Sequence, residues 1–170
     1  MNFYELSRAR YSVRKYDQKP VEDEVLRKVL EAGATAPTAK NLQPQRIYVL
    51  KSEEAVAKMR EITRCAFNAP VVLLVCGNKE TAWVNPFNDR SSNEMDCSIV
   101  TTQMMLQAQE LGLGTCWACW FDTAKTKEAF AIPENEEVFA ILPLGYPAED
   151  CKPAGLHFSR KGLEETVTVL

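Results

Sequence analysis

The longest apolar run of the chain, from Pro70 to Cys76, constrains the fold more than any other stretch. It is far shorter than the roughly 18 apolar residues that a membrane-spanning helix needs, so no membrane partner is expected. Because Pro70 and Gly77 bound it, it predicts a buried β-strand over residues 71–76. A second apolar run from Val138 to Leu144 predicts another strand. The core of the protein is therefore expected to contain a sheet.

Length and composition fit one globular domain over residues 1–170, since 46% of the residues are hydrophobic and 25% are charged. A net charge of −3 argues against nucleic acid as a partner. The first 25 residues carry too many charges for a signal peptide. We therefore expect a cytoplasmic protein, in which the six cysteines stay reduced.

Helical periodicity is clearest over residues 22–33, where Val25, Leu26, Val29 and Leu30 share one face. Acidic residues occupy the first turn of this segment, where the helix dipole favours them. Weaker patterns predict further elements. The expected helices lie near residues 3–9, 52–64, 96–111 and 122–130, and the further strands lie at 46–50, around 116–119 and at 166–170.

The helix expected over residues 96–111 has apolar residues around most of its circumference. Such a helix is buried in the core or in a subunit interface. The segment before it, residues 78–94, has no clear period and carries Trp83, Pro86 and Phe87 among polar residues. We interpret this segment as a mobile flap.

A basic segment follows the first expected helix, with four cations between Arg8 and Lys15. If residues 11–16 are extended, Ser12 and Arg14 lie on the same side of the backbone. Together with Arg10 they would form a cradle for an anionic ligand. A solvated basic surface would explain the same residues and stays open as an alternative.

The connection between residues 34 and 50 combines stiff and amide-bearing residues, namely Pro37, Asn41, Gln43 and Pro44. Proline fixes φ, whereas the two amides each offer a donor and an acceptor. The loop could hold a ligand. An ordinary helix-to-strand connection remains the alternative.

A glycine pair, Gly112 and Gly114, does not form a dinucleotide-binding loop. It follows a helix and precedes a strand, which reverses the required order, and Trp117 stands where a third glycine would be. We therefore exclude a Rossmann site.

Cys116 and Cys119 have the spacing of a redox dithiol or of half a zinc site. A zinc site needs a second ligand pair, but the chain has a single histidine, His157, so no metal is expected. The two cysteines lie in an apolar, tryptophan-flanked stretch, which favours buried structural thiols over a redox pair.

Five motifs resemble, in order and spacing, the signatures of the FMN-dependent nitroreductase family. They extend over nearly the whole chain. The motifs are Arg8-x-Arg10-x-Ser12-x-Arg14-x-Tyr16, Ala36-Pro-Thr-x-x-Asn41-x-Gln43-Pro44, Gly112-Leu-Gly-Thr-Cys-Trp117, Leu144-Gly-Tyr-Pro147 and Arg160-Lys161.

The resemblance implies an α+β fold, a three-layer α/β/α sandwich around a mainly antiparallel sheet. It also implies an intertwined homodimer with FMN at the subunit interface. The chain departs from the family pattern by having Thr38 for a serine and Gln45 for a tryptophan.

By the same resemblance, Arg10, Tyr11 and Ser12 would bind the phosphate and ribityl chain of FMN. Arg14 would be the cation near flavin N1 and O2, where negative charge develops during reduction. The remaining expected cofactor ligands belong to three segments. They are Pro37, Thr38, Ala39, Asn41 and Gln43 from the other subunit, Cys116, Trp117 and Ala118 near N5, and Arg160 and Lys161 at the phosphate.

The implied activity is hydride transfer from NADH or NADPH through flavin N5 to an electrophilic small-molecule acceptor such as a nitroaromatic or a quinone. No protein general acid or nucleophile is expected. A flavin-binding carrier or sensor without NAD(P)H turnover is the first alternative. A thiol redox protein that uses Cys116 and Cys119 is the second.

Overall fold

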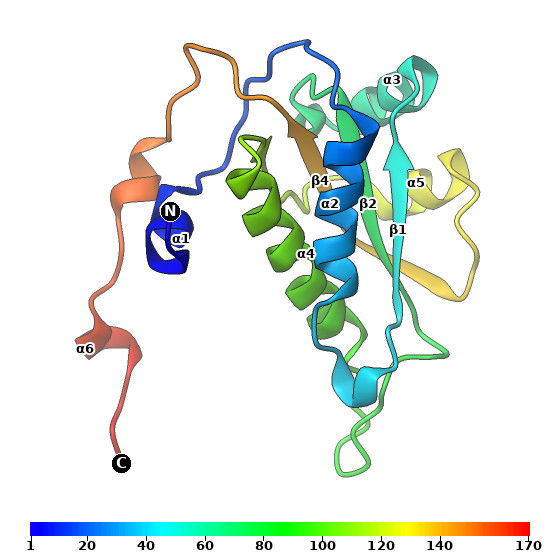
Figure 1. Cartoon of the computed structure of the whole chain (residues 1–170). Helices are drawn as coiled ribbons and strands as arrows, with labels where there is room; N and C mark the ends of the chain where they lie inside the picture. Colours follow the sequence, from blue (N-terminus) through cyan, green and yellow to red (C-terminus); the bar gives the residue numbers. More distant parts are fainter.

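The structure, a computed structural model that describes residues 1–170, is organised around one four-stranded sheet (Figure 1). The strand order is β1-β2-β4-β3, and all three strand pairs are antiparallel. The two predicted apolar runs form the central pair, β2 and β4. The strands are β1 (Gln45–Leu50), β2 (Val71–Asn78), β3 (Gly114–Thr115) and β4 (Glu136–Gly145).

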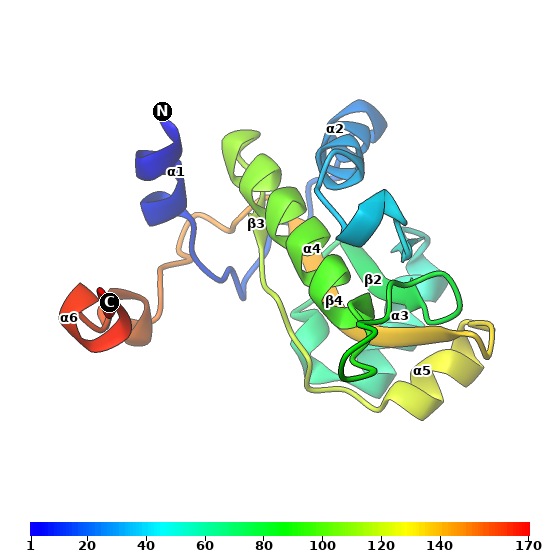
Figure 2. The same ribbon diagram turned by 90° about the horizontal axis from the view of Figure 1, so that it is seen from below.

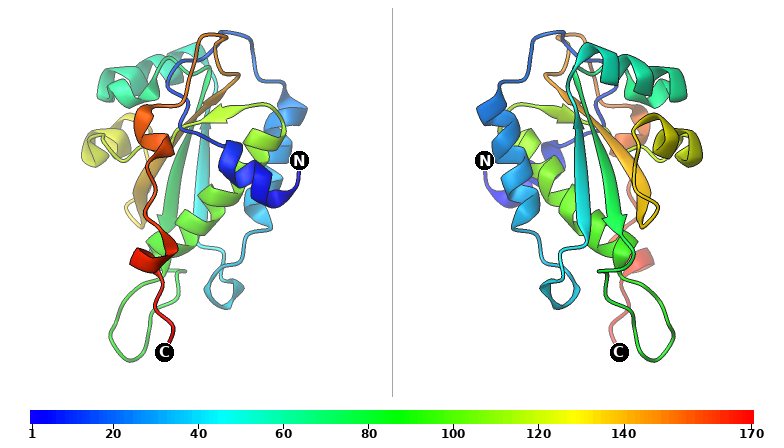
Figure 3. Two further views of the ribbon diagram at one scale, coloured as in Figure 1. Left: turned by 90° about the vertical axis from the view of Figure 1, so that its left-hand side faces the viewer. Right: turned by 90° about the vertical axis from the view of Figure 1, so that its right-hand side faces the viewer.

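Helices cover both faces of the sheet (Figure 2). On one face lie α2 (Asp23–Ala34) and α4 (Asn93–Glu110), and on the other lie α3 (Glu53–Ile62) and α5 (Thr123–Ala129). This confirms the three-layer α/β/α sandwich that the resemblance implied. Two short helices, α1 (Phe3–Ala9) and α6 (Leu163–Thr166), lie outside the layers (Figure 3).

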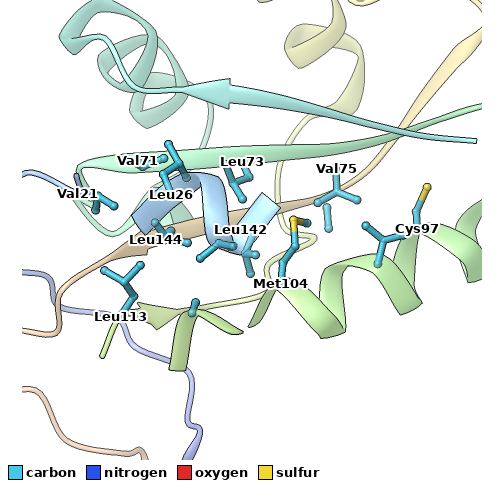
Figure 4. Packing of buried hydrophobic residues seen from close by; sticks show 14 of the residues in the cluster. Val21, Leu26, Val71, Leu73, Val75, Cys97, Met104, Leu113, Leu142 and Leu144 are labelled. Carbon is cyan, nitrogen blue, oxygen red and sulfur yellow. The ribbon is translucent and has the colours of Figure 1, made fainter. Parts of the chain in front are cut away.

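Strand β2 is buried on both faces because its side chains alternate between two cores. Leu73 and Val75 pack in the cluster beneath α2 and α4, as Figure 4 shows. Leu74 and Cys76 pack in the cluster on the α3 and α5 side. A strand that faces two cores has no polar face, which explains its continuous apolar sequence.

A bulge interrupts the pairing of β2 with β4. Val75 pairs with Ala140, whereas the next residue, Cys76, pairs with Val138, so Phe139 has no partner. As a result Val138 and Ala140, two positions apart, belong to opposite cores.

Helix α4 begins at Asn93, three residues before the predicted start. Cys97, Val100 and Met104 are buried against the sheet, with Cys97 and Met104 visible in Figure 4. Its opposite side is less covered, since Met105 and Leu106 are only partly buried and Met95 is 52% exposed. The predicted burial in the core therefore holds for one side of the helix.

Two strand predictions require correction. Residues 166–170 form no strand, since α6 is followed by extended chain that joins no ladder. Residues 116–119 form no strand, and beyond β3 they contact β4 only through the Cys116 amide, which donates to Pro143, and through a bridge between Ala118 and Ile141. Alternation predicted the first strand and an apolar stretch predicted the second, but a strand also needs an available neighbour.

The segment between β2 and α4 makes a local hairpin. Its two sides meet at a bridge between Val84 and Ser91, and the Ser92 amide donates to the Trp83 carbonyl at 2.8 Å. The mobility of this flap stays a prediction.

The basic segment after α1 is extended, as predicted, and is fastened to the sheet. The Val13 amide donates to the Thr115 carbonyl at 2.9 Å, and the buried Tyr16 hydroxyl lies 2.9 Å from the Val13 carbonyl and 3.1 Å from that of Pro143. A Cβ at Gly114 would lie 2.4 Å from a Val13 methyl group. The absence of a side chain at Gly114 therefore permits this close packing.

Helix α1 and residues 151–170 lie beside the sandwich as outlying arms (Figures 1 and 3). They expose several large apolar side chains. None of the helices is long and apolar enough to cross a bilayer. The exposed residues of the arms include Phe3, Tyr4, Leu156, Phe158 and Leu163.

Candidate functional site

Arg10, Arg14 and Arg160 form an arginine cluster beside β3. The pKa of Arg10 is lowered from its ordinary value, first by burial and then by the positive charge of Arg160. A bound anion would stabilise the charged form of Arg10, which burial and Arg160 both disfavour. The structure thus brings together three sequence-predicted residues that are separated by up to 150 positions.

No carboxylate neutralises the arginine cluster. None of the ion pairs of the chain includes any of its three members. Arg14 donates to the Ser12 carbonyl at 3.2 Å, and Arg160 donates to the Ser159 carbonyl at 3.0 Å. These hydrogen bonds orient the two side chains but do not neutralise their positive charges. The cluster has the chemistry of a site for a phosphate or another multiply charged anion.

The Cys116 thiol lies under the arginine cluster and is buried. Burial raises its pKa, whereas Arg14 and a hydrogen bond with Ser12 act in the opposite direction. Cys119 is exposed and accepts a hydrogen bond from the Trp117 ring at 3.2 Å, so the prediction that both cysteines are buried is wrong for Cys119. A buried thiol with a raised pKa does not suit dithiol exchange.

Tyr11 connects the basic segment with the carboxyl-terminal arm. Its hydroxyl donates to the Cys151 carbonyl at 3.4 Å, and its ring meets that of His157 edge to face with centroids 6.4 Å apart. These contacts hold the arm where Arg160 can reach Arg10. Lys161 is exposed and makes no hydrogen bond or ion pair with the rest of the chain.

Backbone amides alternate in direction just after β3. The Cys116 amide donates to Pro143 at 3.3 Å and the Ala118 amide donates to Ile141 at 3.0 Å, so both point into the sheet. The Trp117 amide between them has no acceptor in the chain. Of the three residues predicted to lie near N5, Trp117 has a free amide, whereas the amides of Cys116 and Ala118 are used within the fold.

The Pro37 loop, residues 37–43, has an unusual backbone. Lys40, Asn41 and Gln43 all have φ between 50° and 55°, a region that residues other than glycine seldom occupy. The Thr38 hydroxyl accepts a hydrogen bond from the Gln43 amide at 3.1 Å, which closes the loop on itself. Such strain persists only where surrounding contacts impose it, and it often marks a ligand-binding segment.

Asp96 supplies the contact that imposes this shape, and the sequence reasoning missed it. Its carboxylate accepts from the Ala39 amide at 2.9 Å and from the Ser92 hydroxyl at 2.7 Å, and the residue is 2% exposed. The only signal was an acidic residue at the start of an apolar helix, which a favourable helix dipole explains equally well.

The arginine cluster and the Pro37 loop lie at opposite ends of α4 (Figure 1). The loop contacts Asp96 in the first turn, whereas the cluster surrounds β3, which follows the last turn. An 18-residue helix is about 27 Å long. The predicted cofactor residues therefore form two groups that one chain does not bring together.

A cavity of about 420 Å³ lies next to the Pro37 loop. It separates the loop from the hairpin that precedes α4. Its lining is Pro37, Thr38, Ala39, Trp83, Asn85, Asn88, Arg90, Ser91, Ser92, Met95, Asp96 and Ile99.

Comparison with known protein families decides the relationship of this chain. A family model described as the nitroreductase family matches residues 7–68 and 64–146. The chain belongs to the nitroreductase family. The matched residues include the basic segment, the Pro37 loop and β3, whereas Arg160 lies outside them.

Individual nitroreductase relatives agree with this assignment. The crystal structure of a nitroreductase family protein from Clostridium difficile is 41% identical, with a TM-score of 0.93, and covers 99% of this chain and 98% of its own. An FMN-dependent nitroreductase from the same species is 30% identical, with a TM-score of 0.73, and covers 88% of this chain and 89% of its own. A Methanothermobacter thermautotrophicus protein, provisionally named NADH dehydrogenase/NAD(P)H nitroreductase, is 31% identical and covers 88% of this chain and 80% of its own.

Proposed function

We propose that this nitroreductase family member is an FMN-dependent oxidoreductase that transfers a hydride from NADH or NADPH to an electrophilic acceptor such as a nitroaromatic or a quinone. The observation that carries the proposal is the arginine cluster, in which Arg10 and Arg14 lie near Cys116, Arg160 lies near Arg10, and none of the three has a carboxylate partner. The names of relatives, which include FMN and NAD(P)H, support the same chemistry.

The arginine cluster fits the phosphate of FMN. A phosphate dianion would balance the charges of Arg10 and Arg160, whose repulsion is otherwise unrelieved. The Ser12 hydroxyl, beside the same cations, would donate to a phosphate or ribityl oxygen. Lys161 follows Arg160 in the sequence and would add a further positive charge only after its side chain turns toward the cluster.

Arg14 and Trp117 would act on the ring rather than on the phosphate. Arg14 would hold a fixed positive charge beside N1 and O2, where negative charge develops. The free Trp117 amide would donate to the edge of the ring. Bound FMN would itself supply the hydride chemistry, so the protein needs no general acid or nucleophile of its own.

A homodimer would complete the site. Because the Pro37 loop lies about one helix length from the arginine cluster of its own chain, the loop of a second copy would supply the missing wall. The outlying arms expose the kind of apolar surface that a partner subunit covers.

The proposal is tested by recording the visible spectrum of the purified protein and then adding NADH or NADPH without oxygen. We expect flavin absorbance that bleaches within seconds, and the faster donor identifies the coenzyme. A flavin that neither donor bleaches would favour a binding protein without turnover. A colourless protein that FMN does not restore would refute the proposal.

A further inference from the structure

The cavity beside the Pro37 loop contains an arginine whose side chain has no partner in the chain. Arg90 lines it and makes no ion pair, side-chain hydrogen bond or contact with an aromatic ring. The only other charged residue in the lining, Asp96, is 2% exposed and uses both oxygens within the fold. The charge that a ligand in this cavity would meet is therefore positive.

The polar groups around Arg90 are mainly donors. Asn85 and Asn88 use their side-chain oxygens to accept from the amides of Phe87 and Arg90, at 2.9 and 3.1 Å. Their NH₂ groups remain free. Amide and guanidinium donors on one wall suit a ligand that carries a carboxylate or a similar acceptor-rich group.

The remaining lining is apolar and includes an aromatic ring. Trp83, which is partly buried, offers a stacking surface, and Met95 and Ile99 of α4 form an apolar wall. A volume of about 420 Å³ lies within the range of small-molecule sites and would admit a one- or two-ring compound.

We infer that this cavity binds the electron acceptor and selects a flat aromatic compound with a negatively charged substituent. Arg90 would pair with the charge and Trp83 would stack on the ring. The inference rests on the proposed function, because the Pro37 loop that forms one wall is the segment expected to meet the flavin. For a nitroarene, one hydride from NADH and one proton from solvent convert the nitro group into a nitroso group and release one water.

The first test measures binding of 4-nitrobenzoate and neutral 4-nitrobenzamide to the purified protein by titration calorimetry. We expect the benzoate to bind about tenfold more tightly, as a charged hydrogen bond allows. Arg90→Gln should remove this preference, while Arg90→Lys keeps part of it. Arg27→Gln, which removes an exposed arginine on α2, is the matched control and should change nothing.

Trp83→Leu separates stacking from charge. It should weaken binding of both compounds equally, because stacking does not depend on the carboxylate. An unchanged preference in Arg90→Gln, or a loss of preference in the Arg27→Gln control, would overturn the role of Arg90. Thermal unfolding of each variant checks that its fold is intact.

The second test measures kcat/KM for the two acceptors at saturating NADH. We expect Arg90→Gln to lower only the value for nitrobenzoate, with the KM for NADH unchanged. A rise confined to the KM for NADH would mean that the cavity holds a phosphate of the donor, and would overturn the acceptor assignment. If neither acceptor is reduced but the binding preference depends on Arg90, the proposed function fails and the anion-selective cavity stands.

Discussion

The arginine cluster at one end of α4 and the Pro37 loop at the other are built from different kinds of group. The cluster presents side-chain charge, with Arg10 and Arg14 on an extended segment and Arg160 on the carboxyl-terminal arm. The loop presents an unusual backbone, with three residues at positive φ, held by the Thr38 hydroxyl within it and by the buried Asp96 carboxylate from outside. The cluster is therefore prepared for a ligand by its positive charge, and the loop is prepared by its backbone conformation.

This difference teaches which changes each end should tolerate. Charge acts over several ångströms, so replacing one arginine of the cluster leaves the positive charge of the other two in effect. A backbone shape that depends on one buried hydrogen-bond acceptor fails as a unit when that acceptor is removed. The predictions below test this contrast, from the largest expected effect to the smallest.

Arg10→Ala should weaken FMN binding about 100-fold, since it removes the most buried cation of the cluster and a charged hydrogen bond. Fluorescence titration of the protein freed of flavin measures the dissociation constant. Arg8→Ala is the control, because Arg8 lies in the same segment but over the Tyr4 ring, outside the cluster. Equal effects of the two substitutions would contradict the cluster.

Arg14→Ala should slow bleaching of the flavin by NADH about 30-fold and change FMN affinity much less, because its charge would act on the reacting ring. Anaerobic stopped-flow absorbance gives the rate. Rate and affinity that fall together would show that Arg14 serves only as a phosphate ligand.

Asp96→Ala should lower turnover about tenfold and the free energy of unfolding by roughly 2 kcal/mol, because it leaves the Ala39 amide and the Ser92 hydroxyl unpaired. Asp96→Asn keeps an acceptor for Ala39 and should recover most of the turnover. Ser92→Ala is the control that removes only the second contact. Urea unfolding and steady-state kinetics measure both effects, and unchanged turnover in a folded Asp96→Ala variant would contradict this role of the loop.

Alkaline pH should destabilise the folded state through two buried thiols, Cys76 and Cys97, one in each core. Burial raises the pKa of the Cys76 and Cys97 thiols from 9.0 to about 12. The folded state therefore holds these protons more tightly than the unfolded state does. The contribution of the two thiols to the free energy of unfolding is full below pH 9.0 and is lost as the pH rises toward about 12.

Urea unfolding at a pH below 9.0 and at one above it measures this loss. The Cys76→Ala/Cys97→Ala variant should show a smaller fall, whereas replacing the exposed Cys119 should leave the fall as it is. An identical fall in the double variant would assign the effect to other groups.

Replacing Cys116 and Cys119 together with serine should leave flavin reduction unchanged within about twofold, because a buried thiol with a raised pKa is a poor nucleophile. Abolished turnover in a folded, flavin-loaded variant would instead establish the thiol redox protein.

The sequence predicted those parts of the fold and site whose cause is local. Strand β2 faces two cores and α2 faces one, so a continuous apolar run predicts the strand and helical periodicity predicts the helix. Arg10 and Arg14 were recognisable as a possible cradle for an anion because they lie in one extended basic segment, whereas Arg160 was predicted only from the family resemblance.

Contacts between residues that are far apart in the sequence could not be predicted in this way. Asp96 and Ala39 are 57 positions apart, so nothing near either residue indicates their hydrogen bond. The alternation of residues 166–170 predicted a strand, but no free sheet edge lies beside this segment. The separation of the two groups was implied only by the family resemblance, which assigned the Pro37 loop to the other subunit.

The fastening of the basic segment to the sheet has a kinetic consequence. Tyr16, the Val13 backbone and the space left by Gly114 hold this segment in place without help from the arginines. A ligand that arrives therefore meets a surface whose conformational entropy has already been lost during folding. Its uptake should be limited by encounter and electrostatic attraction rather than by rearrangement of the chain, and the association rate should fall as salt is added.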